Sequence, residues 1–269
     1  MSGVEGRPRI FVHIGTHKTG TSSFQEWLGH HDSELRERFG IAMYRGAFPN
    51  CREIGLACAS PNRSLPTRGI PQWVDPAWRR HVGELVAVQL ARSEDLVLSS
   101  EALSFLRSPE EVGHLAQLLH GRDVTILVVL RNRADFLDSW AKHLQRDRYK
   151  LSRDPSSFAY VETDSWLADY DSLVGVYKSV FGTDHVRVID YDQAMVRNGS
   201  IIPAVMAEVV SDVTKLPDWH SARKNVGSDV AKSRRQSKES VRVRVARFIR
   251  HPIATSKRVV QRRRNDARY

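Results

Sequence analysis

Short apolar runs alternate along the chain with stretches in which apolar residues recur at helical spacing. The apolar runs lie at residues 9–14, 95–100, 124–130 and 185–190, and each predicts a β-strand. Helical spacing follows the first run at Phe24, Trp27 and Leu28, and it returns over residues 109–119, 136–144 and 166–181. This repeated order of strand and helix predicts an α/β fold with a doubly wound, mostly parallel sheet in three layers.

The run at residues 124–130 shows almost no alternation of apolar and polar positions. Such a continuous run is typical of a strand that is buried on both faces, in the interior of a parallel sheet. Two stretches, 44–78 and 147–162, follow neither period and are rich in Pro, Arg, Ser and aromatic residues. We expect both of them to be loops around a site.

The net charge of +10 comes from one end of the chain. Residues 229–269 hold 14 Lys or Arg against 3 acidic residues, which leaves 27 basic and 31 − 3 = 28 acidic residues elsewhere. We therefore predict a folded domain over residues 1–228 and a basic, helical or flexible tail over 229–269. The tail is either a solvated end or a surface for an anionic membrane, a polyanionic substrate or, less expected, nucleic acid.

Several classes of protein are excluded or disfavoured by the sequence. No apolar run approaches the ~20 residues of a membrane span, so a transmembrane enzyme is excluded. Residues 1–15 contain neither the apolar core nor the cleavage site of a signal peptide. Cys51 and Cys58 are too few for a disulfide framework and are not spaced as a CxxC pair. These features predict a cytoplasmic protein, with peripheral membrane binding through the tail as an open alternative.

A glycine-containing loop follows the first predicted strand. Gly15 and Gly20 have four residues between them, as in the Walker A loop, where backbone amides and a helix N-terminus bind a phosphate. Walker A places lysine directly after the second glycine, whereas here Thr21 follows Gly20 and the lysine comes earlier, as Lys18. The third predicted strand ends in Arg131 and not in a magnesium-binding aspartate, which favours a second anion over a metal.

Together these motifs resemble those of the sulfotransferases that use 3′-phosphoadenosine 5′-phosphosulfate (PAPS). Residues 13–23 resemble the family's 5′-phosphosulfate loop, and Arg131 with Ser139 resembles its 3′-phosphate motif. Residues 99–105 are similar to the segment in which carbohydrate-type members place a catalytic glutamate, here Glu101. Residues 224–227 match the C-terminal nucleotide-closing loop but depart from its fuller Gly-x-x-Gly-x-x-Lys form. The resemblance covers residues 9–227.

The resemblance implies a P-loop-like sulfotransferase fold, PAPS as donor, adenosine 3′,5′-bisphosphate (PAP) as product and no metal. It assigns Lys18 to the bridging oxygen of the donor, where negative charge develops during transfer. The donor-binding residues that it implies are Thr16, Lys18, Thr19, Gly20, Thr21, Ser22, Arg131, Ser139, Lys224 and Gly227.

The residues leave two questions open. The base that accepts the acceptor's proton is Glu101, at the end of a strand, or His17, beside Lys18 in the loop. The acceptor is a small molecule, glycan or lipid, and the resemblance favours a carbohydrate-like hydroxyl. Two other functions compete with sulfuryl transfer: a P-loop kinase or NTPase, and a non-catalytic basic protein that binds nucleic acid or membranes.

Overall fold

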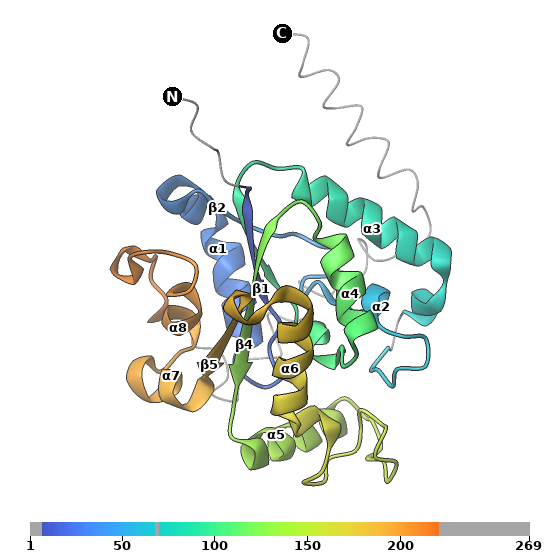
Figure 1. Ribbon diagram of the computed structural model, residues 1–269. Coiled ribbons are helices and arrows are strands. Elements are labelled where there is room, and N and C mark those ends of the chain that lie inside the picture. Colours follow the sequence, from blue (N-terminus) through green and yellow to red (C-terminus); the bar gives the residue numbers. More distant parts are fainter. Residues whose placement is uncertain (1–6, 68–69, 221–269) are drawn as a thin grey trace.

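The computed structural model describes residues 7–67 and 70–220, which form a parallel sheet between two layers of helices (Figure 1). Within these residues the sheet has five strands in the order β2-β3-β1-β4-β5. Their bounds are Arg9–His13 (β1), Ile41–Met43 (β2), Asp95–Ser99 (β3), Asp123–Leu130 (β4) and Val186–Asp190 (β5). All neighbouring strands are parallel, and β1 lies between β3 and β4. The predicted doubly wound α/β architecture is confirmed, and β2 is a strand that the apolar pattern did not predict.

The helices cover both faces of this sheet. One face carries α1 (Thr21–Phe39), α7 (Tyr191–Asn198) and α8 (Ile202–Met206), and the other carries α2 (Arg52–Cys58), α3 (Pro76–Leu90), α4 (Pro109–Leu118) and α6 (Tyr170–Phe181). The helix α5 (Arg133–Arg146) follows β4 at the carboxyl edge of the sheet (Figure 1). Short 3₁₀ helices lie at Pro71–Val74 (η1), Glu101–Phe105 (η2), Trp166–Ala168 (η3), Thr183–His185 (η4) and Val213–Lys215 (η5). Each face of the sheet therefore has its own apolar cluster.

The prediction that residues 44–78 form a loop is wrong. This stretch contains α2, η1 and the first turn of α3. Six of the seven residues of α2 are buried, including Glu53, so the helix has no polar face and no amphipathic period by which to recognise it. Residues 147–162 contain neither helix nor strand, as predicted.

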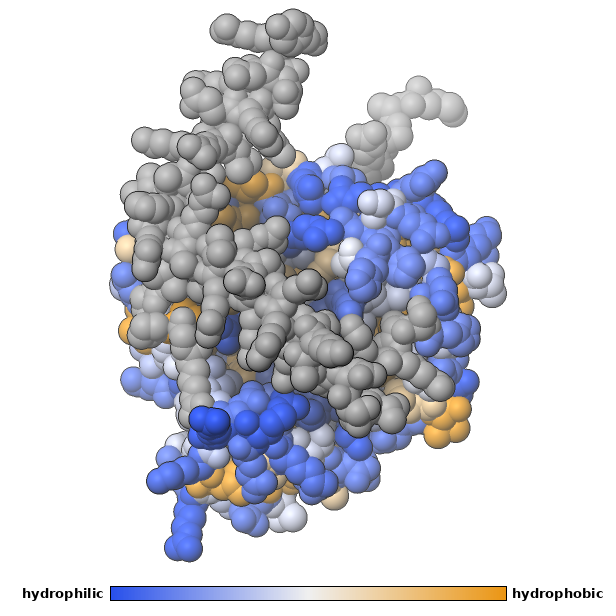
Figure 2. All heavy atoms as spheres, turned by 180° about the vertical axis from the view of Figure 1, so that it is seen from behind, coloured by the Kyte–Doolittle hydropathy of each residue, from blue (hydrophilic) through white to orange (hydrophobic). Residues whose placement is uncertain are grey.

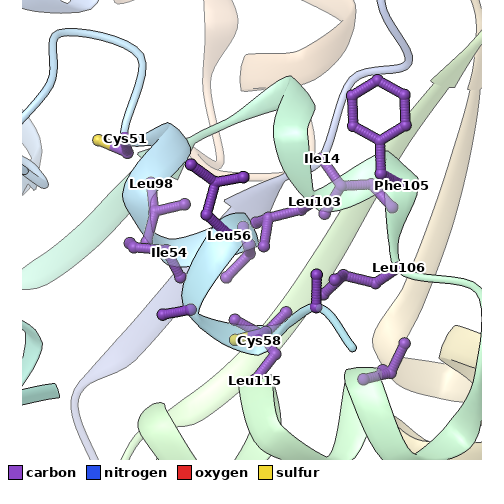
Figure 3. Packing of buried hydrophobic residues seen from close by; sticks show 14 of the residues in the cluster. Ile14, Cys51, Ile54, Leu56, Cys58, Leu98, Leu103, Phe105, Leu106 and Leu115 are labelled. Atoms are coloured by element: carbon purple, nitrogen blue, oxygen red, sulfur yellow. The ribbon is translucent and has the colours of Figure 1, made fainter. Parts of the chain in front are cut away.

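The helix α2 packs closely against η2. A Cβ atom added to Gly55 would lie 2.8 Å from the backbone carbon of Ala102, so only glycine allows this approach. Apolar residues of α2, among them Ile54 and Leu56, join Leu98 and Leu103 in the core (Figure 3). This packing fixes the first turn of α2 beside the carboxyl end of β3.

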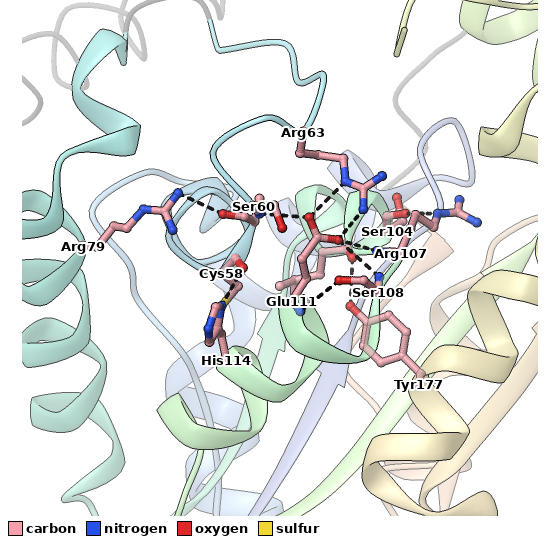
Figure 4. A network of polar contacts seen from close by, with 12 residues as sticks. Cys58, Ser60, Arg63, Arg79, Ser104, Arg107, Ser108, Glu111, His114 and Tyr177 are labelled. Carbon is pink, nitrogen blue, oxygen red and sulfur yellow. Dashed lines mark hydrogen bonds and ion pairs between the residues drawn. The ribbon is translucent and has the colours of Figure 1, made fainter. Parts of the chain in front are cut away.

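A polar network ties the chain after α2 to the start of α4 (Figure 4). The carboxylate of Glu111 accepts hydrogen bonds from the backbone N–H of Ser60 at 2.9 Å and of Arg107 at 2.8 Å, and from the guanidinium of Arg63 at 2.7 Å. Burial raises the pKa of Glu111, but these hydrogen bonds and the charge of Arg63 outweigh burial and lower it. Glu111 therefore stays ionised and satisfied inside the protein.

On the face shown in Figure 2, the visible described surface is mainly hydrophilic, with separate small apolar patches. No helix within the described residues is long and apolar enough to span a bilayer. Cys51 and Cys58 are both buried free thiols, as predicted. The predicted boundary at residue 228 and the basic tail lie outside the described residues.

The space around two glycines, Gly55 at the contact of α2 with η2 and Gly113 in α4, predicts opposite effects on stability when each is replaced by alanine. Gly55→Ala should lower the free energy of unfolding by about 1–3 kcal/mol, because its methyl group overlaps the backbone at Ala102. Gly113→Ala, in α4 with nothing within 4 Å of the added Cβ, should raise it by about 1 kcal/mol through helix propensity. Urea unfolding of both variants checks this. Equal effects of the two substitutions would contradict the assigned packing.

Candidate functional site

The backbone after β1 continues to pair with β4 beyond the last strand residue. Ile14 donates its N–H to Leu127 O at 3.0 Å, Val129 donates to Gly15 O at 2.5 Å, and Thr16 donates to Val129 O at 2.8 Å. Gly15 has φ +86, in the left-handed region that favours glycine. The glycine loop therefore begins at a fixed position on the carboxyl edge of the sheet.

Threonine hydroxyls inside the loop hold its shape. Thr19 Oγ1 donates to Thr16 O at 2.6 Å, and Thr21 Oγ1 points to the same carbonyl at 3.4 Å. Thr16 Oγ1 donates to Val129 O at 3.3 Å. All three threonines are buried, whereas Ser22 is exposed in the first turn of α1. The structure thus gives the three threonine hydroxyls a role in loop geometry, whereas Ser22 presents an exposed hydroxyl in the first turn of α1.

Positive charge gathers at this loop. Lys18 has φ +65, and burial lowers its pKa, as do the nearby charges of Arg146 and then Arg131. Gly20 precedes α1 in the left-handed region, and neither a capping side chain nor an acidic residue in the first turn offsets the positive end of the helix. The loop, the two arginines and the helix start therefore form a region suited to an anion.

Arg131 follows β4 directly, as predicted, and its side chain is 24% exposed. Its guanidinium stacks on Tyr191 at 5.2 Å, and Asp135 lies 3.9 Å away. Its Nε is buried and has no hydrogen-bond partner among the described residues. Ser139 lies in the second turn of α5 and is partly exposed. Arg131 therefore retains a donor for a further acceptor group.

Glu101 opens η2, directly after the end of β3, and both of its carboxylate oxygens accept amide hydrogen bonds. Gln25 Nε2 donates to Oε2 at 3.0 Å, and Asn50 Nδ2 donates to Oε1 at 3.3 Å. Gln25 Nε2 also lies 3.1 Å from Ser99 O. A Cβ added to Gly15 would lie 3.1 Å from Glu101 Cβ, so the loop and the carboxylate residue are in contact. The carboxylate is held in one orientation at the edge of the loop.

Sequence reasoning missed Gln25 and Asn50. Gln25 lies one turn into α1, and its place after the loop is the only sequence signal for a role near the site. Asn50 falls within the stretch that the pattern assigned to loops, where nothing indicates what its side chain contacts. Both are brought to Glu101 by packing between segments far apart in sequence.

His17, the other candidate base, belongs to an aromatic cluster. Its ring centroid lies 4.7 Å from that of Phe105 and 4.8 Å from that of Trp140. Burial, followed by the charges of His143 and Lys18, lowers the pKa of His17 to about 3. The imidazole is therefore neutral and weakly basic near pH 7, and its packing suits it to shaping the site.

Lys18, Glu101 and Arg131 follow β1, β3 and β4, which are adjacent strands, so the sheet brings the three predicted residues to one edge. Lys224 and Gly227 lie outside the described residues. No group of three or more His, Cys, Asp or Glu side chains is placed to hold a metal ion within the part of the chain that the structure describes.

No family model matches this sequence, and no curated protein is similar to it. Among solved structures, the crystal structure of a sulfotransferase from Alicyclobacillus acidocaldarius is similar to this chain. The two share 19% sequence identity with a TM-score of 0.50, over 94% of this chain and 99% of the other. At this identity the likeness supports the fold, and this protein has a sulfotransferase-like α/β fold.

The environment of His17 predicts how the protein responds to acid. Its folded pKa of about 3 lies below the ~6.5 of an unfolded histidine. As the pH falls, His17 is therefore protonated in the unfolded chain at a higher pH than in the folded protein. The stability linked to neutral His17 is complete above pH ~6.5 and is lost as the pH falls toward 3. NMR titration should show no shift of the His17 ring signals between pH 8 and 5. A midpoint near 6.5 would contradict the buried, neutral assignment.

Proposed function

We propose that this protein is a sulfotransferase that moves a sulfuryl group from PAPS to a hydroxyl of a small molecule, glycan or lipid. Three features at one edge of the sheet carry this proposal. They are a cationic loop, an arginine whose buried Nε has no partner among the described residues, and a carboxylate that two side-chain amides orient. The sulfotransferase-like fold supports the same chemistry.

The residues at this edge fit the anionic groups of the donor. The amides from Thr19 to Ser22 and the positive start of α1 suit the 5′-phosphosulfate. Arg131 suits the 3′-phosphate, because its buried Nε lacks a partner among the described residues and a guanidinium matches phosphate oxygens. Ser139 is the second candidate for that phosphate, and Lys224 and Gly227 remain predicted residues of a closing loop.

Different residues then have different roles in sulfuryl transfer. PAPS, when bound, supplies an activated sulfuryl group. As the acceptor oxygen bonds to sulfur, the bond from sulfur to the bridging oxygen breaks, and its electron pair stays on the 5′-phosphate of PAP. Glu101 accepts the proton of the acceptor hydroxyl, and Lys18 stabilises the negative charge on the leaving oxygen. The charge of Lys18 and the N–H donors of the loop stabilise the negative charge that develops, so the proposed mechanism needs no metal.

Calorimetry with PAP and AMP tests donor binding. Arg131 should make PAP bind roughly 10- to 100-fold more tightly than AMP, as expected for charged hydrogen bonds to one added phosphate. Arg131→Gln should remove most of this difference while the affinity for AMP stays the same. Equal affinities of the unaltered protein for PAP and AMP would overturn the proposed donor.

Glu101→Gln tests the base. Glutamine keeps the shape and can still accept a hydrogen bond from either Gln25 or Asn50, but it cannot accept the proton. We expect kcat to fall by ~10²- to 10⁴-fold with the affinity for PAP unchanged. His17→Asn is the comparison, and it should retain far more activity. The reverse order of the two variants would make His17 the base.

A further inference from the structure

The segment that carries Arg52 is anchored beside Glu101 at three points. Asn50 donates to Glu101 Oε1, Ser100 Oγ donates to Cys51 O at 3.1 Å, and Gly55 packs on the backbone at Ala102. Arg52 is the first residue of α2, between these anchors in sequence. The first turn of α2 and the first residue of η2 therefore form one rigid unit.

The guanidinium of Arg52 is stacked on the ring of Phe48 at 4.6 Å, and the residue is half-buried. Burial lowers its pKa, while Glu53, Tyr149 and Glu101 lie close enough for their charges to raise it. No described residue forms a hydrogen bond or an ion pair with this guanidinium. Arg52 thus holds a partly buried positive charge on the segment that is bonded to the candidate base, and its donors have no partner among the described residues.

Other arginines that are buried or half-buried in the described chain use their donors within the fold. Arg63 forms two hydrogen bonds with Glu111. Arg107 and Arg122 each donate to several backbone carbonyls. The cost of desolvating a guanidinium is offset in these three cases by protein partners. Arg52 has no such partner within the part of the chain that the structure describes, which points to a ligand.

The position of Arg52 separates it from the donor side of the site. Lys18 and Arg131 follow β1 and β4, whereas Arg52 packs beside the residues that follow β3, on the other side of β1 from β4. Glu101 follows β3 and contacts the loop at Gly15, so it lies between the segment of Arg52 and the groups that follow β1 and β4. An anion at Arg52 would belong to the acceptor, the molecule whose hydroxyl faces Glu101.

We propose that Arg52 forms an anion subsite for the acceptor, which is an alcohol that carries a carboxylate, sulfate or phosphate group a few bonds from the reacting hydroxyl. This inference rests on the proposed function, since it names the class of acceptor for the same site. Arg52 would offset the repulsion between the anion of the acceptor and Glu101, and its forked donors would orient the hydroxyl toward the base.

Calorimetry on the full-length protein loaded with PAP tests this with paired probes: methyl glucoside against methyl glucuronide, and glycerol against glycerol 3-phosphate. At least one charged probe should bind 10-fold or more tightly than its neutral partner, and the pair that does so distinguishes a carboxylate from a phosphate. Arg52→Gln should abolish the preference, and Arg52→Lys should retain part of it. Arg80→Gln, which removes an exposed charge from α3, should leave the preference intact.

Three results would overturn the subsite: equal binding of charged and neutral probes, an unchanged preference in Arg52→Gln, or an equal loss in Arg80→Gln. PAP affinity, measured on the same samples, should be unchanged by Arg52→Gln, which separates a local effect from misfolding. A protein that fails to bind PAP would contradict the proposed donor. The same probes titrated into the unloaded protein would still report on Arg52.

Discussion

The site depends on backbone pairing that continues past the end of β1. Backbone hydrogen bonds made by residues 14–16 hold the chain against β4. On the β3 side, the N–H of Ser100 donates to His13 O at 2.9 Å. Backbone hydrogen bonds alone thus fix the start of the loop between two neighbouring strands. Gly15 allows this because a side chain there would collide with Glu101. A loop fixed by the sheet can hold Lys18 and the first turn of α1 in place without a bound ligand.

The sequence predicted those parts of the fold and site that depend on local pattern. The strands around Val12, Leu98 and Val128 appear as apolar runs because they are buried on both faces of the sheet. The positions of Lys18, Glu101 and Arg131 follow from strand ends, because adjacent parallel strands bring their carboxyl ends to one edge. In each case a short window of residues contains the information.

What the sequence did not predict depends on contacts between distant segments. The helix α2 is short and buried all round, so its residues lack a polar face, and β2 has three residues. Asn50 reaches Glu101, and the segment with Arg52 lies beside it, because Gly55 lets α2 approach η2. This contact joins positions almost fifty residues apart, and no local period encodes it. The low basicity of His17 likewise comes from its aromatic neighbours, Phe105 and Trp140, which lie far from it in the chain.

The electrostatics of the site link the two proposals. Lys18 lies near Arg146 and Arg131, and burial together with these two charges lowers the pKa of Lys18. An anion bound among these groups would offset the repulsion and raise the pKa of Lys18, so the bound anion would stabilise the charged form of this lysine. Glu101 gains no comparable compensation from the donor, which adds negative charge nearby. In the proposed subsite, Arg52 would offset the negative charge of both Glu101 and an anionic acceptor, and the reacting hydroxyl would then lie between two regions of positive potential.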